Sequence, residues 1–354
     1  MINMSDTPKS EKNSLLKISI VIFLGAVFTL SIAFLVKSSM PNSSSSVADL
    51  TLALSKCRGA GADKCIAKNS VLIGKMQSPA TGLNAAKLLL ESRRDLRDGC
   101  HSLIHEIGKQ FYVEFKDEAM VKNNSWCSYG YYHGLMQSYG EDNLDTLISY
   151  ARKLCNKVEG KLTDDCMHGI GHAAYTNLLS IPKSLAICSE ISEDSFASSC
   201  ADGTIMEEIM KSPNGLLTSG FSVKDCIYFD NNAVISGCAK GMSQQNVNLG
   251  LDLTQSCSHF TDETIYKSCA HGFGMSLAGN QASGSSFGTT KNQYQECGEI
   301  ETCVDGFGWI SYMYFLDVEK ASNLCTEYFR KSYLESCIET VILASRNDKN
   351  ELSN

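Results

Sequence analysis

The chain has 354 residues, 43% of them hydrophobic, and it carries a formal net charge of −8. This length and apolar content are typical of a folded globular protein rather than a disordered chain. The acidic balance, together with the lack of any Lys/Arg-rich block in the sequence, argues against a nucleic-acid partner.

The first predicted element is an apolar stretch from Ile18 to Val36 with lysines at both ends. It is just long enough to span a bilayer as a helix. More lysines precede it than follow it, which places the N-terminus in the cytoplasm and the rest of the chain outside. We therefore expect a single-pass protein of the cell membrane, with a cytoplasmic tail over 1–16, a transmembrane anchor over 17–37 and a Ser-rich stalk over 38–47. A cleaved signal peptide is the alternative, and it predicts the same compartment.

Sixteen cysteines follow this stretch, and no two of them form a Cys-x-x-Cys motif. An even cysteine count without metal knuckles, in an exported domain, is typical of disulfides in an oxidising compartment. Taken in chain order, five of the pairs are 11 or 12 positions apart. The expected bonds are Cys57–Cys65, Cys100–Cys127, Cys155–Cys166, Cys188–Cys200, Cys226–Cys238, Cys257–Cys269, Cys297–Cys303 and Cys325–Cys337.

The second cysteine of a pair often opens the same phrase, as in Cys166-Met-His-Gly-Ile-Gly and Cys269-Ala-His-Gly-Phe-Gly. From Cys155 onward, successive pairs begin 28 to 40 positions apart, which is the period of tetratricopeptide-like helical hairpins. Each repeat is expected to contain two helices with the disulfide across their junction. The recurring glycine after the histidine position predicts close helix-to-helix approach, because glycine otherwise weakens a helix.

Helix starts are marked by acidic and capping residues. Asp230 is the predicted N-cap of a helix over 231–247, and Thr261 with Asp262 and Glu263 predicts another start. The expected fold is all-α, with a transmembrane helix followed by a disulfide-stapled α-hairpin array, either a solenoid or an αα-toroid. The array should cover 48–345, and 346–354 should form a tail.

At the level of architecture, this pattern is similar to the cysteine-bridged Sel1-like repeat proteins, which also staple each helical hairpin. The spacing and the consensus of this chain differ from those of that family. The resemblance therefore implies a hairpin array and carries no function or site residue with it.

Six of the seven histidines lie in or beside the repeat phrase, and four of them form two His-x-x-x-His pairs. Residues at i and i+4 share one face of a helix, so both imidazoles of a pair can reach one metal ion. The candidate metal ligands are His101, His105, His133, His168, His172 and His271, with Glu106, Asp202, Glu207 and Asp305 as supporting acids. Imidazole with carboxylate suits a divalent Zn, Cu or Fe ion. The alternative is that these residues clasp neighbouring repeats.

No complete catalytic motif, phosphate loop or dinucleotide fingerprint is present in the sequence, so whether the chain is an enzyme is left open. The first functional hypothesis is a membrane-anchored extracytoplasmic binding or assembly module, with a protein or peptide partner on its concave face. The second is a His-rich metal-binding protein or metalloenzyme with its site on that face. The third is a structural protein of the envelope.

Overall fold

The computed structural model describes residues 46–59, 61–93, 96, 100–121, 127, 130–155, 162–212, 215–283 and 289–352. The chain divides into two compact units, Met1–Asp49 and Leu50–Asn354, and the description below concerns the second. The expected anchor over 17–37 and the tail over 1–16 lie outside the described residues. No helix in the described ranges combines the length and the hydropathy that a bilayer span requires.

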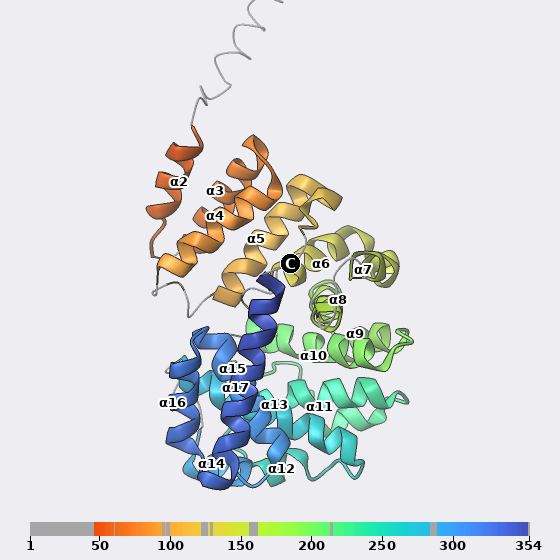
Figure 1. The fold of residues 1–354 in the computed structure, drawn as a ribbon. Helices are drawn as coiled ribbons and strands as arrows, with labels where there is room; N and C mark the ends of the chain where they lie inside the picture. Colours follow the sequence, from red (N-terminus) through yellow and green to blue (C-terminus); the bar gives the residue numbers. More distant parts are fainter. Residues whose placement is uncertain are drawn as a thin grey trace, which may run out of the picture. The chain divides into compact units, whose positions relative to one another are not determined.

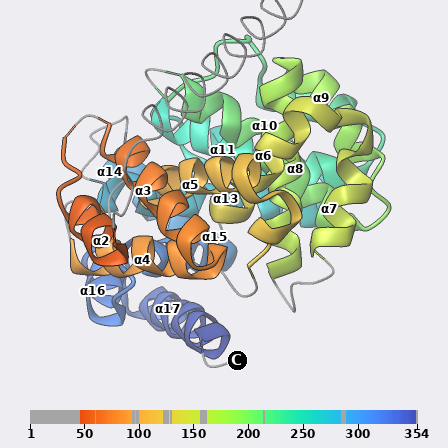
Figure 2. The same cartoon turned by 90° about the horizontal axis from the view of Figure 1, so that it is seen from above.

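Every regular element in the described ranges is a helix, which confirms the predicted all-α class. Nine long helices form a series in which each packs against the next (Figures 1 and 2), and we call this series the helix row. The row consists of α3 (Ala62–Met76), α5 (Cys100–Phe115), α6 (Gly130–Asn143), α8 (Leu162–Leu178), α10 (Asp194–Lys211), α11 (Asn232–Asn248), α13 (Glu263–Ala282), α15 (Glu301–Phe315) and α17 (Lys331–Leu352).

The remaining elements lie before the row or link its members. They are α2 (Val47–Ser55), α4 (Pro79–Ser92), η2 (Lys116–Ala119), η3 (Leu144–Thr146), α7 (Leu147–Cys155), α9 (Ile181–Ser189), η4 (Val223–Tyr228), α12 (Leu253–Cys257), α14 (Lys291–Cys297) and α16 (Val318–Tyr328). From α7 onward a linking helix and the row helix after it form one repeat. The final row helix extends past residue 345, where the repeat domain was expected to end.

The disulfides join the two helices of each repeat. In the repeat made by α9 and α10, for example, Cys188 near the end of the linking helix bonds to Cys200 in the second turn of the row helix. The sixteen cysteines form the eight bonds given above from their order in the sequence. The linking helix therefore cannot separate from its partner, and the stapled hairpin is the structural unit.

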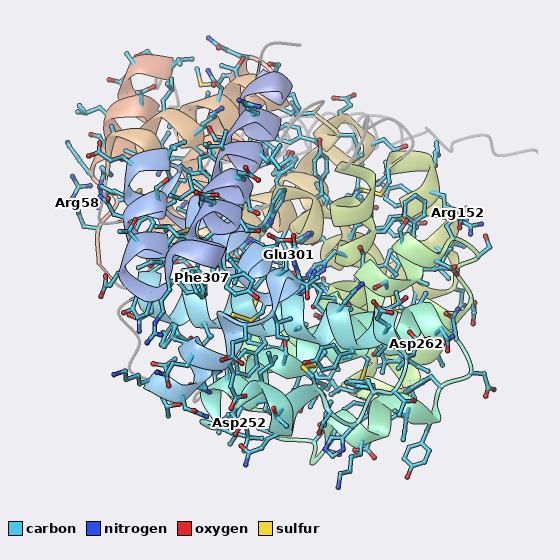
Figure 3. All side chains as sticks on the ribbon, turned by 60° about the horizontal axis from the view of Figure 1, so that its bottom comes forward. Arg58, Arg152, Asp252, Asp262, Glu301 and Phe307 are labelled. Carbon is cyan, nitrogen blue, oxygen red and sulfur yellow. A yellow bond between two sulfur atoms is a disulfide. The ribbon has the colours of Figure 1, made fainter. Side chains whose placement is uncertain are left out.

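Glycines let the row helices approach one another closely. A Cβ atom on Gly203 would overlap the backbone carbonyl oxygen of His168 on the preceding row helix, and one on Gly306 would overlap that of His271. Any side chain at these positions would push the helices apart, so the recurring glycine is required for packing. The buried interior between the helices is filled by large side chains such as Phe307 (Figure 3).

Helix starts lie within one residue of the sequence pattern at both α13 and α11. Asp262 caps α13 (Figure 3), accepting hydrogen bonds from the backbone N–H groups of Thr264 and Ile265. At α11 the N-cap is Asn231 rather than the expected Asp230. A capping side chain must reach the second or third backbone N–H of the helix, and Asp230 lies one residue too early to do so.

The stabilisation by each disulfide should depend on the length of the loop that it closes. Replacing both Cys188 and Cys200 with alanine, 12 positions apart, should lower the free energy of unfolding by about 3 kcal/mol. Replacing Cys297 and Cys303, 6 positions apart, should cost about 0.6 kcal/mol less, because halving the loop lowers its closure entropy. All four cysteine side chains are fully buried, so the two double variants lose a similar amount of buried packing. Urea unfolding of both variants measures the difference, and a larger loss for the shorter loop would contradict this account.

Candidate metal centre

Five histidines lie together on three consecutive members of the helix row. We call His101, His105, His133, His168 and His172 the histidine cluster. His101 and His105 come from α5, His133 from α6, and His168 and His172 from α8. On α8, Cys166 faces the linking helix α7 through its disulfide. A helix turns about 100° per residue, so positions two and six residues later point away from that linking helix.

The ring nitrogens of the cluster lie at the spacing of ligands that share one ion. His105 Nε2 is 3.1 Å from His101 Nε2 and 3.0 Å from His133 Nδ1. Two nitrogens bound tetrahedrally to one metal at about 2.0 Å lie about 3.3 Å apart. Since His105 Nε2 carries at most one proton, it cannot donate a hydrogen bond to both of its neighbours. A shared cation would satisfy all three nitrogens.

The cluster contains two groups of three donors that meet at His133. The first group is His101, His105 and His133, and the second is His133, His168 and His172. Within each group the ligand atoms all lie within 4.8 Å of one another. Four of the five histidines are buried, and His101 is half-buried at the edge.

Acceptors outside the cluster hold the other nitrogen of several rings. His101 Nδ1 is 2.8 Å from the carbonyl oxygen of Cys127, and His172 Nδ1 is 2.6 Å from Glu207 Oε2. His168 Nδ1 faces Asp202 Oδ2 at 3.6 Å. A carbonyl or a carboxylate can only accept, so the Nδ1 of His101 and of His172 carries the proton and Nε2 keeps its lone pair.

His172 provides the clearest sign of a missing ligand. Its side chain is completely buried, and its Nε2 atom has no hydrogen-bond partner among the residues that the structure describes. An unsatisfied buried acceptor costs about 1–3 kcal/mol, so this arrangement needs an explanation. A cation bound at Nε2 supplies one.

The carboxylate that holds His172 is itself tightly held. Glu207 accepts hydrogen bonds from Gln137 Nε2 at 2.7 Å and from Thr176 Oγ1 at 3.0 Å, and Lys211 Nζ lies 3.2 Å from it. Gln137 and Thr176 were not predicted as site residues. Each lies four positions after a cluster histidine on the same helix, so the i, i+4 spacing could have identified both.

The electrostatics of the site favour the neutral form of three imidazoles beside an ionised acid. Burial lowers the pKa of His101 to about 4, and burial with neighbouring imidazoles holds the pKa of His105 and His168 well below the ordinary value. Burial alone would raise the pKa of Glu207. The hydrogen bond from His172 and the contact with charged Lys211 more than offset that effect and lower the pKa of Glu207 to about 2. At neutral pH His101, His105 and His168 therefore present the uncharged rings that a metal ion requires.

His271, the sixth predicted ligand, belongs to neither group. It lies on α13, which packs against α11 and α15 rather than against the helices of the cluster. The corresponding positions on the two intervening row helices are Asp202 and Lys240, which form an ion pair at 2.8 Å. A residue at this position of a repeat mainly contacts the next repeat along the row. Histidines therefore come together only where adjacent repeats both carry them.

Of the four predicted supporting acids, two contact the histidine cluster and two do not. Asp202 and Glu207 contact cluster histidines, whereas Glu106 accepts a hydrogen bond from Gln110 on its own helix. Asp305 accepts hydrogen bonds from hydroxyl groups of the next row helix, α17. The donors are Ser336 and Thr340, each at 3.0 Å. Asp305 therefore clasps two repeats, which is the alternative that the sequence left open.

Glu207 should strengthen metal binding without touching the ion. Replacing it with glutamine keeps its shape but removes the negative charge that makes His172 a stronger ligand. We expect this change to weaken Zn²⁺ binding by about 10- to 100-fold. Glu208→Gln is the matched control, because that neighbouring carboxylate is also buried but accepts from Thr218 and Ser219 instead. Isothermal titration of both variants decides the point, and equal affinities would contradict a supporting role for Glu207.

The chain matches no family model, no curated protein and no solved structure.

Proposed function

We propose that this chain is a transition-metal-binding protein and that the histidine cluster is its site. The observation that carries the proposal is the orientation of the imidazoles. Ring nitrogens of neighbouring histidines face one another at 3.0 and 3.1 Å, while outer acceptors hold the opposite nitrogens of His101 and His172. Histidines that only held neighbouring repeats together would pair with hydrogen-bond acceptors rather than with one another. Asp305, which does hold two repeats together, pairs in this way with hydroxyl donors.

The donor set narrows the class of metal. Every candidate ligand is an imidazole, and no cysteine of the described residues is free to supply a thiolate. Imidazole ligands suit Zn²⁺, Cu²⁺ and Fe²⁺, whereas Mg²⁺ and Ca²⁺ prefer oxygen. Three protein ligands leave a fourth position on a tetrahedral ion, which is the pattern of zinc sites that act on a bound water or substrate. An enzymatic role would use that position.

The compartment is part of the proposal. Eight disulfides in one domain persist in an oxidising environment, which supports a location outside the cytoplasm. An anchor over 17–37 would hold the domain at the membrane, as the sequence predicts. The roles of binding or assembly module and of structural envelope protein stay predictions, since no contact of the described residues identifies a partner.

The direct test is the metal content of the full chain after loading with Zn²⁺ and removal of excess ion. The wild type should retain stoichiometric zinc by elemental analysis. A double variant with His105→Ala and His172→Ala, which removes one ligand from each group, should lose it. His271→Ala is the matched control, because it changes a histidine of the same repeat phrase outside the cluster, and it should retain the zinc. A wild type that binds no zinc, or a double variant that binds as much, would overturn the proposal.

A further inference from the structure

We propose that an ion in the histidine cluster carries a protic ligand, such as water or a small amine, and that Gln137 accepts a hydrogen bond from it. This inference rests on the proposed function. His172 Nε2 and Gln137 Oε1 are both buried, and neither has a hydrogen-bond partner among the described residues. Buried acceptors without a partner are rare in folded proteins. The ion accounts for His172 Nε2, and the amide oxygen of Gln137 needs an occupant of its own.

Glu207 fixes the orientation of the Gln137 amide group. Glu207 Oε2 lies 2.7 Å from Gln137 Nε2 and 2.6 Å from His172 Nδ1. Because an ionised carboxylate can only accept hydrogen bonds, the amide presents its NH₂ group to Glu207. The reversed orientation would bring two acceptor oxygens together. The amide nitrogen is therefore committed to Glu207, and the amide oxygen can only accept from something else.

Gln137 lies beside the ligands of the second group. It is four positions after His133 on α6, so the two side chains share one face of the helix. Through Glu207 it is also joined to His172 on the neighbouring helix α8. Gln137 is only 1% exposed, so bulk water does not supply the missing donor. We therefore assign the donor to a ligand of the ion.

The open position of the ion can hold such a donor. Three histidines leave a fourth position on a tetrahedral ion. Water, ammonia or an amine can bind the ion there through a lone pair and donate a hydrogen to Gln137 Oε1. An anion without hydrogen, such as azide, would instead place a second acceptor against that buried oxygen. A site that hydrogen-bonds its ligand discriminates against an analogue that cannot donate, so the fourth position should favour protic ligands.

The ligand preference of the fourth position tests the role of Gln137. The full chain is loaded with Co²⁺, whose visible spectrum reports ligand exchange, and is titrated separately with ammonia and with azide. Gln137→Met keeps the length of the side chain and removes the amide oxygen. We expect it to lower the ratio of ammonia affinity to azide affinity by about tenfold, the effect of losing one buried hydrogen bond. Both affinities are measured on the same loaded protein, so a change in Co²⁺ affinity does not alter the ratio.

A matched variant and a second measurement support this test. Gln110→Met should leave the ratio unchanged, because Gln110 Nε2 also donates to a glutamate, Glu106, at 2.8 Å, but neither residue belongs to the cluster. The second measurement uses the wild type alone, so a misfolded variant cannot obscure it. Electron–nuclear double resonance of the chain loaded with Cu²⁺ should show strongly coupled protons of the fourth ligand, and these should disappear in D₂O.

The outcomes separate this inference from the proposed function. An equal ratio in the wild type and in Gln137→Met would overturn the role of Gln137 and leave the metal-binding proposal intact. A loaded wild type that binds neither ammonia nor azide, or that lacks the exchangeable protons, would do the same, because the ion would then carry no protic ligand. A chain that binds no metal ion would overturn both proposals.

Discussion

His133→Ala is expected to abolish most of the stabilisation that Zn²⁺ confers on the folded chain. His133 is the one residue common to both groups of ligands, so its loss damages the site whichever group binds the ion. Changing an outer-shell partner alone weakens metal binding about 10- to 100-fold, and loss of a direct ligand should exceed that. At a free Zn²⁺ concentration about 1,000 times the dissociation constant, one site adds about 4 kcal/mol to the free energy of unfolding. A 100-fold weaker site adds no more than about 1.4 kcal/mol.

The measurement compares urea unfolding with and without Zn²⁺ for each protein separately. The cavity left by the missing ring destabilises the variant in both conditions and therefore cancels from the metal-dependent difference. His271→Ala should keep the wild-type difference, since His271 lies outside both groups. An equal Zn²⁺-dependent gain in His133→Ala and in the wild type would show that the metal binds elsewhere.

Gly274→Ala and Gly279→Ala, five positions apart on α13, are expected to have opposite effects on stability. A Cβ atom at Gly274 would overlap the carbonyl oxygen of Cys303 on α15, and further backbone atoms of Cys303 and Phe307 leave it no room. The helices must separate, and such overpacking should lower the free energy of unfolding by about 3 kcal/mol. At Gly279 the nearest atom to an added Cβ is a methyl carbon of Ile310 at 3.9 Å, which is ordinary contact.

Gly279→Ala should therefore stabilise the chain by about 0.5–1 kcal/mol, because alanine favours the helix and restricts the unfolded state. The two variants make the same chemical change in the same helix, so the difference between them isolates the close approach of α13 and α15. Urea unfolding measures both. A loss at Gly279 as large as that at Gly274 would show that the effect comes from the helix itself rather than from its packing.

The hairpin architecture was largely predictable, because local rules specify it. Cysteines 11 or 12 positions apart can only join neighbouring segments, and acidic helix starts such as Asp262 identify where row helices begin. The recurring glycine predicted close helix packing, and Gly203 and Gly306 provide it. The N-cap of α11 was predicted one residue before its position at Asn231. Two adjacent polar side chains both suit an N-cap there, and only the backbone path selects between them.

The sequence by itself determined that the site consists of histidines and at which position of the repeat they lie, because residue type and position on a helix are local properties. Five of the six predicted histidines share one cluster, while His271 does not. Only the tertiary structure decided which histidine-bearing helices pack side by side, and which acid lies behind which ring. The 2.6 Å contact of Glu207 with His172 depends on how separate repeats stack. That stacking sets the distance between two residues 35 positions apart, which no local pattern records.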